Sequence, residues 1–143
     1  MPPKLREVLI IDDDQIANYV NERIVTEMQL AHTITILQNG NEGLDYILKV
    51  CGKDHNFCPD LIILDHFMPE LNGLELMEKL HENGLIEEMR TVFLLLAIHT
   101  DIEDLKKFEE LGVQEFTDKP LSKNRLHEAY EKYWANNTAR DHS

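Results

Sequence analysis

The feature that most constrains this chain is an alternation of short apolar runs with longer segments of helical periodicity. Continuous apolar or β-branched runs occupy residues 8–11, 33–37, 61–64 and 92–96, and a further candidate strand follows at 113–117. Continuous apolar runs are typical of strands that are covered on both faces. The sequence therefore predicts five β-then-α units, an α/β fold with a doubly wound, open parallel sheet and helices on both faces.

Candidate caps mark where several of the helices begin. The first helix is predicted from Asp14 to about Met28, with an inward face at four-residue spacing. Asn72, with Glu75 three residues later, predicts a capping box for the third helix. The inward positions of the first helix are Ile16, Val20, Ile24 and Met28. The second helix is expected to begin at Asn41. The fourth is expected to begin at Thr100 and Glu103, and the last is predicted from about Ser122 to Trp134.

The length and charge of the chain limit its organisation and its partners. Its 143 residues suffice for one domain, which we expect at 5–135, followed by a polar tail at 136–143. A net charge of −13 predicts repulsion from nucleic acid and from anionic membranes. Without an apolar run long enough to span a membrane and without a signal-peptide core, the chain is expected in the cytoplasm.

The two cysteines lie in a loop-rich stretch that gives no redox or metal motif. Cys51 and Cys58 form neither a disulfide framework nor a C-x-x-C pair, so we expect reduced thiols. With His55 between them, a zinc site is an alternative, but the fourth ligand that a tetrahedral site requires is not evident.

Charged residues follow three of the predicted strands. Asp12 and Asp13 end the first strand, Asp65 ends the third, and Lys119 lies just past the fifth. In a doubly wound sheet these positions meet at the carboxyl ends of the strands, where such folds bind ligands. Helix capping explains one of the acids, Asp14, but not the convergence of the others. Converging carboxylates predict a Mg²⁺ site, and a carboxylate with a neighbouring lysine predicts an aspartyl-phosphate.

Three sequence blocks resemble the receiver domain of bacterial two-component response regulators. They are VLIIDDD (8–14), LIILDHFMPELNG (61–73) and TDKP (117–120), and NGNE (39–42) is similar to the family's turn into its second helix. The resemblance covers roughly residues 5 to 135. It implies a flavodoxin-like fold with strand order 2-1-3-4-5.

Position by position, the resemblance implies a complete phosphorylation site. Asp65 would be the phospho-acceptor, and Asp12, Asp13, Asp65 and the backbone carbonyl of Phe67 would bind Mg²⁺. Lys119 and the backbone of Ala97 and His66 would bind the phosphoryl oxygens. Phe116 matches the family's switch aromatic, and Pro120 the proline that usually follows a cis peptide bond.

One position departs from the family pattern. Leu96 occupies the end of the fourth strand, where the family carries Thr or Ser. Loss of that hydroxyl predicts a missing hydrogen bond to the phosphoryl group and a weaker switch. Thr100 is an alternative hydroxyl if its loop folds back, although we assign it to the helix cap.

Several side chains near the predicted site have two interpretations. His66 and His99 are expected to be solvated loop histidines, and phosphate binding is the alternative. Phe67 and Met68 either belong to a partner surface or anchor their loop. Tyr130, Tyr133 and Trp134 are expected to pack on the sheet, with a partner contact as the alternative for Trp134.

Three functions are consistent with this sequence. The first is a single-domain response regulator that takes phosphate from a histidine kinase or a phosphotransfer protein and signals to a downstream protein, with homodimerisation left open. Such a chain is a phosphoryl acceptor, capable of autodephosphorylation, rather than an enzyme. The second is a phosphate-independent pseudo-receiver, which Leu96 favours. The third is a hydrolase of the haloacid-dehalogenase type, whose acid spacing Asp12 and Asp14 imitate but which leaves Asp65 unexplained.

Overall fold

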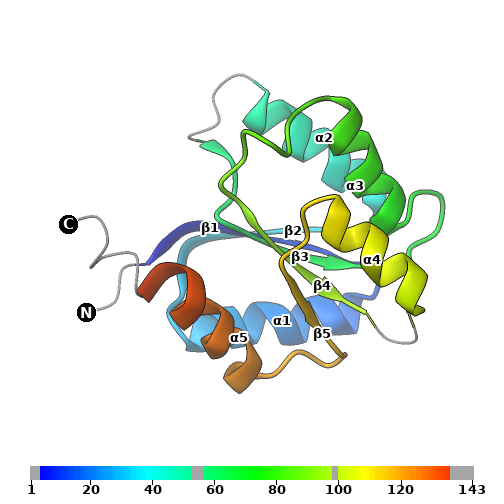
Figure 1. Ribbon diagram of the computed structural model, residues 1–143. Helices are drawn as coiled ribbons and strands as arrows, with labels where there is room; N and C mark the ends of the chain where they lie inside the picture. Colours follow the sequence, from blue (N-terminus) through cyan, green and yellow to red (C-terminus); the bar gives the residue numbers. More distant parts are fainter. Residues whose placement is uncertain (1–3, 53–56, 98–99, 136–143) are drawn as a thin grey trace.

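The computed structural model describes residues 4–52, 57–97 and 100–135. Its elements alternate as predicted (Figure 1). In chain order they are β1 (Leu5–Ile11), α1 (Gln15–Glu27), β2 (Ala31–Leu37), α2 (Gly40–Cys51), β3 (Leu61–Asp65), α3 (Gly73–Glu82), β4 (Val92–Leu96), α4 (Ile102–Glu110), β5 (Glu115–Thr117), α5 (Lys123–Tyr130) and a π-helical turn, η2 (Glu131–Ala135).

The strands form one parallel sheet in the order β2-β1-β3-β4-β5, which confirms the predicted topology. Helices α1 and α5 cover one face of the sheet, and α2, α3 and α4 cover the other (Figure 1). Successive residues of a strand point to opposite faces, so Ile62 and Leu64 join the core under α2 to α4, and Leu61 and Ile63 join the core under α1 and α5. Burial on both faces explains the unbroken apolar runs of the central strands β1, β3 and β4, whereas the edge strands β2 and β5 are less buried.

Helix α1 begins as predicted, and Val20, Ile24 and Met28 of its predicted inward face pack in the core, but Ile16 does not. The Asp14 side chain caps it by accepting from the backbone N–H groups of Ile16 and Ala17. Ile16 was expected in the core, yet its side chain is 75% exposed. It lies in the first turn, beside the loop that carries Lys119, and the inward face starts later, at Asn18 and Asn21.

Helix α4 has a different cap from the predicted one. Asp101, not Thr100, accepts from the N–H of Asp104, at 2.9 Å. A carboxylate is a stronger acceptor than a hydroxyl for the N–H groups of a first turn. The capping box of Asn72 and Glu75 on α3 is confirmed.

The fifth strand is shorter than predicted. It begins at Glu115 rather than at residue 113, because Val113 completes the end of α4 by donating its N–H to the Phe108 carbonyl. Gly112 precedes it with a φ of 109°, a backbone conformation that favours glycine.

A buried carboxylate on β5 holds the carboxyl-terminal elements. Glu115, 6% exposed, accepts from Arg125 of α5 at 2.7 Å and from Lys132 and Tyr133 of η2 at 3.0 and 2.7 Å. Burial alone would raise the pKa of Glu115, but these donors outweigh burial and lower it. The predicted last helix therefore becomes a shorter α5 followed by η2, and Trp134 packs against Tyr130 and the core as expected.

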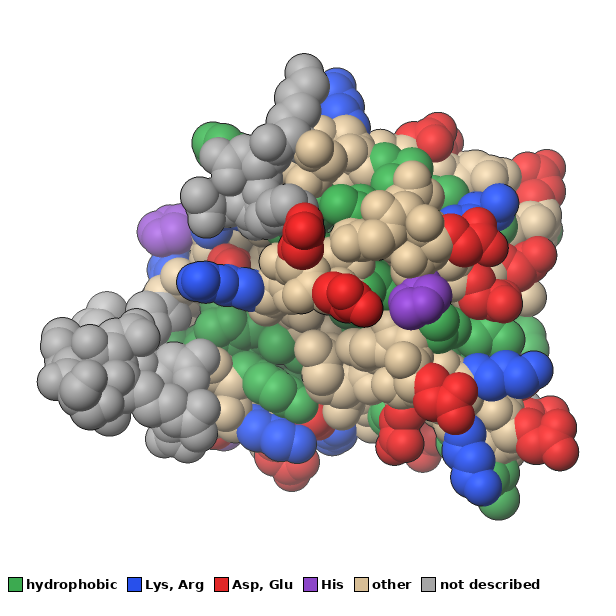
Figure 2. Space-filling model, turned by 45° about the horizontal axis from the view of Figure 1, so that its top comes forward, with side chains coloured by type: hydrophobic (Ala, Val, Ile, Leu, Met, Phe, Trp, Pro, Cys, Tyr) green, Lys and Arg blue, Asp and Glu red, His purple; other side chains and the backbone are tan. Residues whose placement is uncertain are grey.

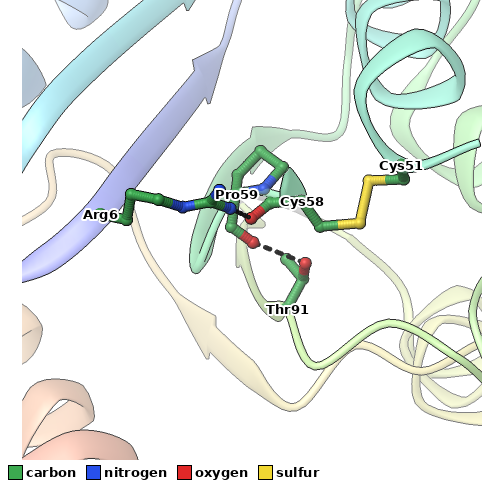
Figure 3. Close-up of a disulfide and its surroundings, with 5 residues drawn as sticks. All are labelled: Arg6, Cys51, Cys58, Pro59 and Thr91. Carbon is green, nitrogen blue, oxygen red and sulfur yellow. Dashed lines mark hydrogen bonds between the residues drawn. A yellow bond between two sulfur atoms is a disulfide. The ribbon is translucent and has the colours of Figure 1, made fainter. Parts of the chain in front are cut away.

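The expectation of reduced thiols is wrong in this structure, because Cys51 and Cys58 form a disulfide (Figure 3). Cys51 ends α2, and Cys58 comes shortly before β3, so the folded chain brings together cysteines that the loop sequence gave no reason to pair. The Cys58 carbonyl accepts from Arg6, and the Thr91 hydroxyl donates to the Pro59 carbonyl at 2.6 Å (Figure 3). His55 lies outside the described residues. The disulfide lies at the opposite end of β3 from Asp65.

Within the described residues, the helices fall short of the length and apolar character that a membrane crossing requires. Acidic side chains are spread over the face of the molecule that Figure 2 shows, with lysines and arginines between them. This surface agrees with the net charge of −13.

Candidate metal and phosphoryl site

Asp12 is held rigidly at the end of β1. Its side chain is fully buried, and its backbone N–H donates to the Leu37 carbonyl at 3.2 Å. The Asn18 amide donates to its backbone carbonyl at 2.8 Å, and the Asp14 N–H donates to its Oδ1 at 2.9 Å. These contacts fix the direction in which the second carboxylate oxygen points.

Lys119 connects the ends of β1 and β3. Its Nζ lies 2.8 Å from Asp12 Oδ2 and 3.2 Å from Asp65 Oδ1. The Lys119–Pro120 peptide bond is cis. Residues more than fifty positions apart along the chain therefore share one ion-paired cluster, as expected for the carboxyl ends of parallel strands.

The carboxylates of Asp12, Asp13 and Asp65 offer oxygens that all lie within 4.8 Å of one another. Asp13 is exposed, whereas the other two are buried. Three hard oxygen donors beside one lysine leave an excess of negative charge, and the exposed Asp13 marks the solvent side of the cluster. The donor set therefore fits Mg²⁺, which takes few protein carboxylates and keeps other oxygen ligands.

The electrostatics of the cluster are unfavourable without a cation. Burial and the neighbouring charge of Asp12 raise the pKa of Asp65 to about 7, although Lys119 opposes the shift. Burial lowers the pKa of Lys119, but contacts with Asp12 and Asp65 more than compensate and raise it. A divalent cation would keep Asp65 in its ionised, nucleophilic form at neutral pH.

The loop after β3 is packed tightly against the acceptor. The Gly73 N–H donates to the His66 carbonyl at 2.8 Å. A side chain at position 73 would bring its Cβ within 2.9 Å of the Asp65 carbonyl oxygen, so only glycine fits there. Phe67 follows in the same loop with an exposed side chain, whereas Met68 is buried and anchors the loop.

Leu96 pairs directly with Asp65 across the sheet and is buried. The Ala97 N–H donates to the Thr117 carbonyl at 2.9 Å, and the His66 N–H donates to the Leu96 carbonyl at 3.4 Å. Either N–H would have to give up its present hydrogen bond to a backbone carbonyl before it could donate to a phosphoryl oxygen. Phe116 is partly buried and packs against the core under α2 to α4.

The environment of His66 differs from the one expected from the sequence. This side chain was expected in solvent but is 3% exposed, and its ring contacts Phe108 of α4. His99 lies outside the described residues. No local pattern could reveal the burial of His66, because Phe108 is more than forty residues away in the sequence.

An apolar hollow of about 260 Å³ adjoins Lys119. We call it the α1 hollow. Its lining includes Ile16, Ala17 and Val20 of α1, Leu96 of β4, and Pro120 and Leu121 of the loop before α5. The exposed side chain of Ile16 makes this hollow part of the surface beside the acceptor.

The chain resembles known signalling proteins in sequence. The response regulator receiver domain family matches residues 8–131. A probable C4-dicarboxylate response regulator, DctR of Priestia megaterium, is 30% identical over 93% of this chain and 54% of its own length. Regulator of RpoS from Escherichia coli K12 is 28% identical over 86% of this chain and 33% of its own length. The chain thus spans about half the length, or less, of these curated relatives.

Solved structures share the fold. A two-component response regulator from Cytophaga hutchinsonii superposes with a TM-score of 0.80 and 28% identity, covering 92% of this chain and 98% of that one. The receiver domain of the histidine kinase CKI1 from Arabidopsis thaliana, solved with Mg²⁺ and BeF₃⁻, has a TM-score of 0.74 at 21% identity and covers 86% of this chain and 88% of that one. With its strand order, its acidic cluster and the family match over residues 8–131, the chain belongs to the response regulator receiver domain family.

Proposed function

We propose that this chain is a response regulator that accepts a phosphoryl group on Asp65 from a histidine kinase or a histidine phosphotransfer protein. The observation that carries the proposal is the position of Lys119, within 3.2 Å of the buried carboxylates of both Asp12 and Asp65. Asp12, Asp13, Asp65 and the Phe67 carbonyl would hold Mg²⁺. When bound, the metal supplies charge neutralisation for the acceptor and the phosphoryl oxygens.

In the transfer step, a carboxylate oxygen of Asp65 attacks the phosphorus of the donor phosphohistidine. An O–P bond forms and the P–N bond breaks, with the electron pair going to the imidazole nitrogen, which then takes up a proton. Lys119 neutralises part of the charge on the transferred group. Attack of water on the acyl phosphate would later return free Asp65 and inorganic phosphate, so the chain catalyses only changes of its own state.

The α1 hollow is the proposed contact for the donor protein. Its apolar lining of Ile16, Ala17 and Val20 lies beside Lys119, so a partner seated there would present its phosphohistidine to the cluster. The strong negative charge of the chain argues against nucleic acid as the partner. We propose that the protein acts in the cytoplasm and signals through a downstream protein.

A second candidate function is a phosphate-independent docking module. Leu96 favours it, because this side chain offers no hydroxyl to a phosphoryl oxygen at the position opposite Asp65. The two functions differ in whether Asp65 is chemically competent.

The deciding experiment is incubation with acetyl phosphate and Mg²⁺ followed by intact-protein mass spectrometry. We expect the mass to rise by one phosphoryl group, and the gain to disappear with a chelator or in Asp65→Asn. Asp118→Asn is the matched control, because it makes the same substitution at an exposed position next to Lys119. It should be modified like the wild type.

Either of two results would contradict the proposal. Absence of any modification in the wild type would favour the docking module. Modification that persists in Asp65→Asn would place the acceptor elsewhere.

A further inference from the structure

His66 is a buried polar side chain with unused hydrogen-bonding capacity. It directly follows the acceptor, and its side chain is 3% exposed. Its Nδ1 is buried and has no hydrogen-bond partner among the described residues. Buried polar atoms are nearly always hydrogen-bonded, and one that is not requires an explanation.

The His66 side chain contacts α4 in two ways. Its Nε2 lies 3.7 Å from Asp104 Oδ2, which is close enough for electrostatic attraction but too long for a hydrogen bond. Its ring meets the ring of Phe108 edge-on, with centroids 4.9 Å apart and an interplanar angle of 90°. The residue next to the acceptor is therefore in direct contact with a helix on the surface.

Helix α4 is anchored less firmly than its neighbour α3. Phe108 is its one fully buried residue, whereas α3 buries Gly73, Leu76, Met77 and Leu80. The ring of His66 thus touches the main hydrophobic anchor of the helix. Helices with few buried contacts need the least free energy to move.

The backbone of His66 links the same residue to the rest of the site. Its N–H donates to the Leu96 carbonyl at 3.4 Å, a long bond, and its carbonyl accepts from Gly73. Leu96 itself has no hydroxyl through which β4 could respond to a phosphoryl group. Its side chain packs in the core under α1 and α5, on the far side of the sheet from α4.

We propose that His66 is a positioning residue that couples the occupancy of Asp65 to the position of α4 through Asp104 and Phe108. This inference rests on the proposed function of Asp65. A phosphoryl group recruits N–H groups and shifts the loop that begins at residue 66. The His66 ring then moves relative to Asp104 and Phe108, and α4 follows. The contact takes the place of a hydroxyl at position 96.

The test uses the whole chain with Mg²⁺ and beryllofluoride, a mimic of the phosphoryl group. Fluorine NMR of bound beryllofluoride reports occupancy, and hydrogen exchange of the α4 amides reports the response of the helix. His66→Phe keeps an aromatic ring against Phe108 but removes Nε2. Asp104→Asn removes the charge on the other side of the contact, and Glu103→Gln is the matched control at an exposed position on the same helical turn.

We expect beryllofluoride to change exchange in α4 of the wild type and of Glu103→Gln. In Asp104→Asn, the bound fluorine signal should persist while the α4 response falls about threefold or more. In His66→Phe, the α4 response should fall as much when it is compared with the wild type at equal bound fluorine signal. If His66→Phe does not fold, Asp104→Asn alone decides. An unchanged α4 response in the variants, or no response in the wild type despite a bound signal, would overturn the coupling. Absence of bound beryllofluoride in the wild type would instead overturn the function of Asp65 and the coupling together.

Discussion

Two buried carboxylates of this protein have opposite environments. Asp65 and Glu115 are 5% and 6% exposed and both contact basic side chains. Burial and Asp12 raise the pKa of Asp65 to about 7, whereas hydrogen bonds from Tyr133, Arg125 and Lys132 outweigh burial and lower the pKa of Glu115. The number of donors decides the difference, because Asp65 shares its one lysine with a second carboxylate. The charge of Glu115 is balanced by donors within the chain, whereas the charge of Asp65 requires a ligand to balance it.

The largest expected change in stability follows from substitution of Glu115, the carboxylate with a structural role. Glu115→Gln removes the charge that Arg125 and Lys132 share, so the free energy of unfolding should fall by about 2–3 kcal/mol. Urea denaturation measures it. Modification by acetyl phosphate should persist wherever the variant is folded. A variant as stable as the wild type would show that the network contributes nothing net.

At the metal and phosphoryl site, substitution of the carboxylate is expected to raise stability rather than lower it. In chelator at pH 8, Asp65→Asn removes one of two repelling carboxylates and should raise the free energy of unfolding by about 1–2 kcal/mol. Denaturation of the wild type and the variant side by side tests this. Destabilisation by Asp65→Asn would mean that the ion pair with Lys119 outweighs the repulsion from Asp12.

The pH dependence of stability should separate the two carboxylates. Between the ordinary pKa of 3.8 and about 7, folded Asp65 holds a proton that the unfolded chain has released, so stability falls as pH rises through this window. We expect a loss of about 1 kcal/mol between pH 6 and pH 7 in chelator. The loss should shrink with Mg²⁺ and in Asp65→Asn. Glu115, whose pKa is lowered, contributes stability that is lost only as the solution becomes acidic.

The smallest expected change in stability tests how much the exposed donor Lys132 contributes to the network around Glu115. Lys132 is 63% exposed, so Lys132→Met should lower the free energy of unfolding only slightly, and by much less than Glu115→Gln does. The same urea titration gives the value. A loss as large as that of Glu115→Gln would assign most of the network's stability to its exposed member rather than to Arg125 and Tyr133.

The local pattern of the chain predicts most of the fold. The unbroken run at 61–64 identifies a strand buried on both faces, and Asn72 with Glu75 identifies the start of α3. Prediction of the element ends fails where neighbouring residues compete for the same role. Val113 completes α4 instead of entering β5, and Asp101 replaces Thr100 as the cap. Ile16 follows helical spacing yet is exposed, and it lies in the first turn of α1 beside the loop that carries Lys119.

The prediction of the site follows the same division. Parallel strands bring their carboxyl ends to one edge, so the convergence of Asp12, Asp65 and Lys119 follows from the order of elements. The sequence could not predict the disulfide between Cys51 and Cys58, which depends on how α2 meets the start of β3. It also could not predict the burial of His66, which depends on Phe108.

By itself, the sequence determined the alternation of strands and helices, the parallel sheet and the acids at its carboxyl edge, because periodicity and chain direction are local properties. Only the tertiary structure decided which buried carboxylate is satisfied. Glu115 gains Arg125, Lys132 and Tyr133 from a later part of the chain, whereas Asp65 must share Lys119 with Asp12. Burial makes an ionised group costly unless donors surround it, and only packing determines where the donors lie.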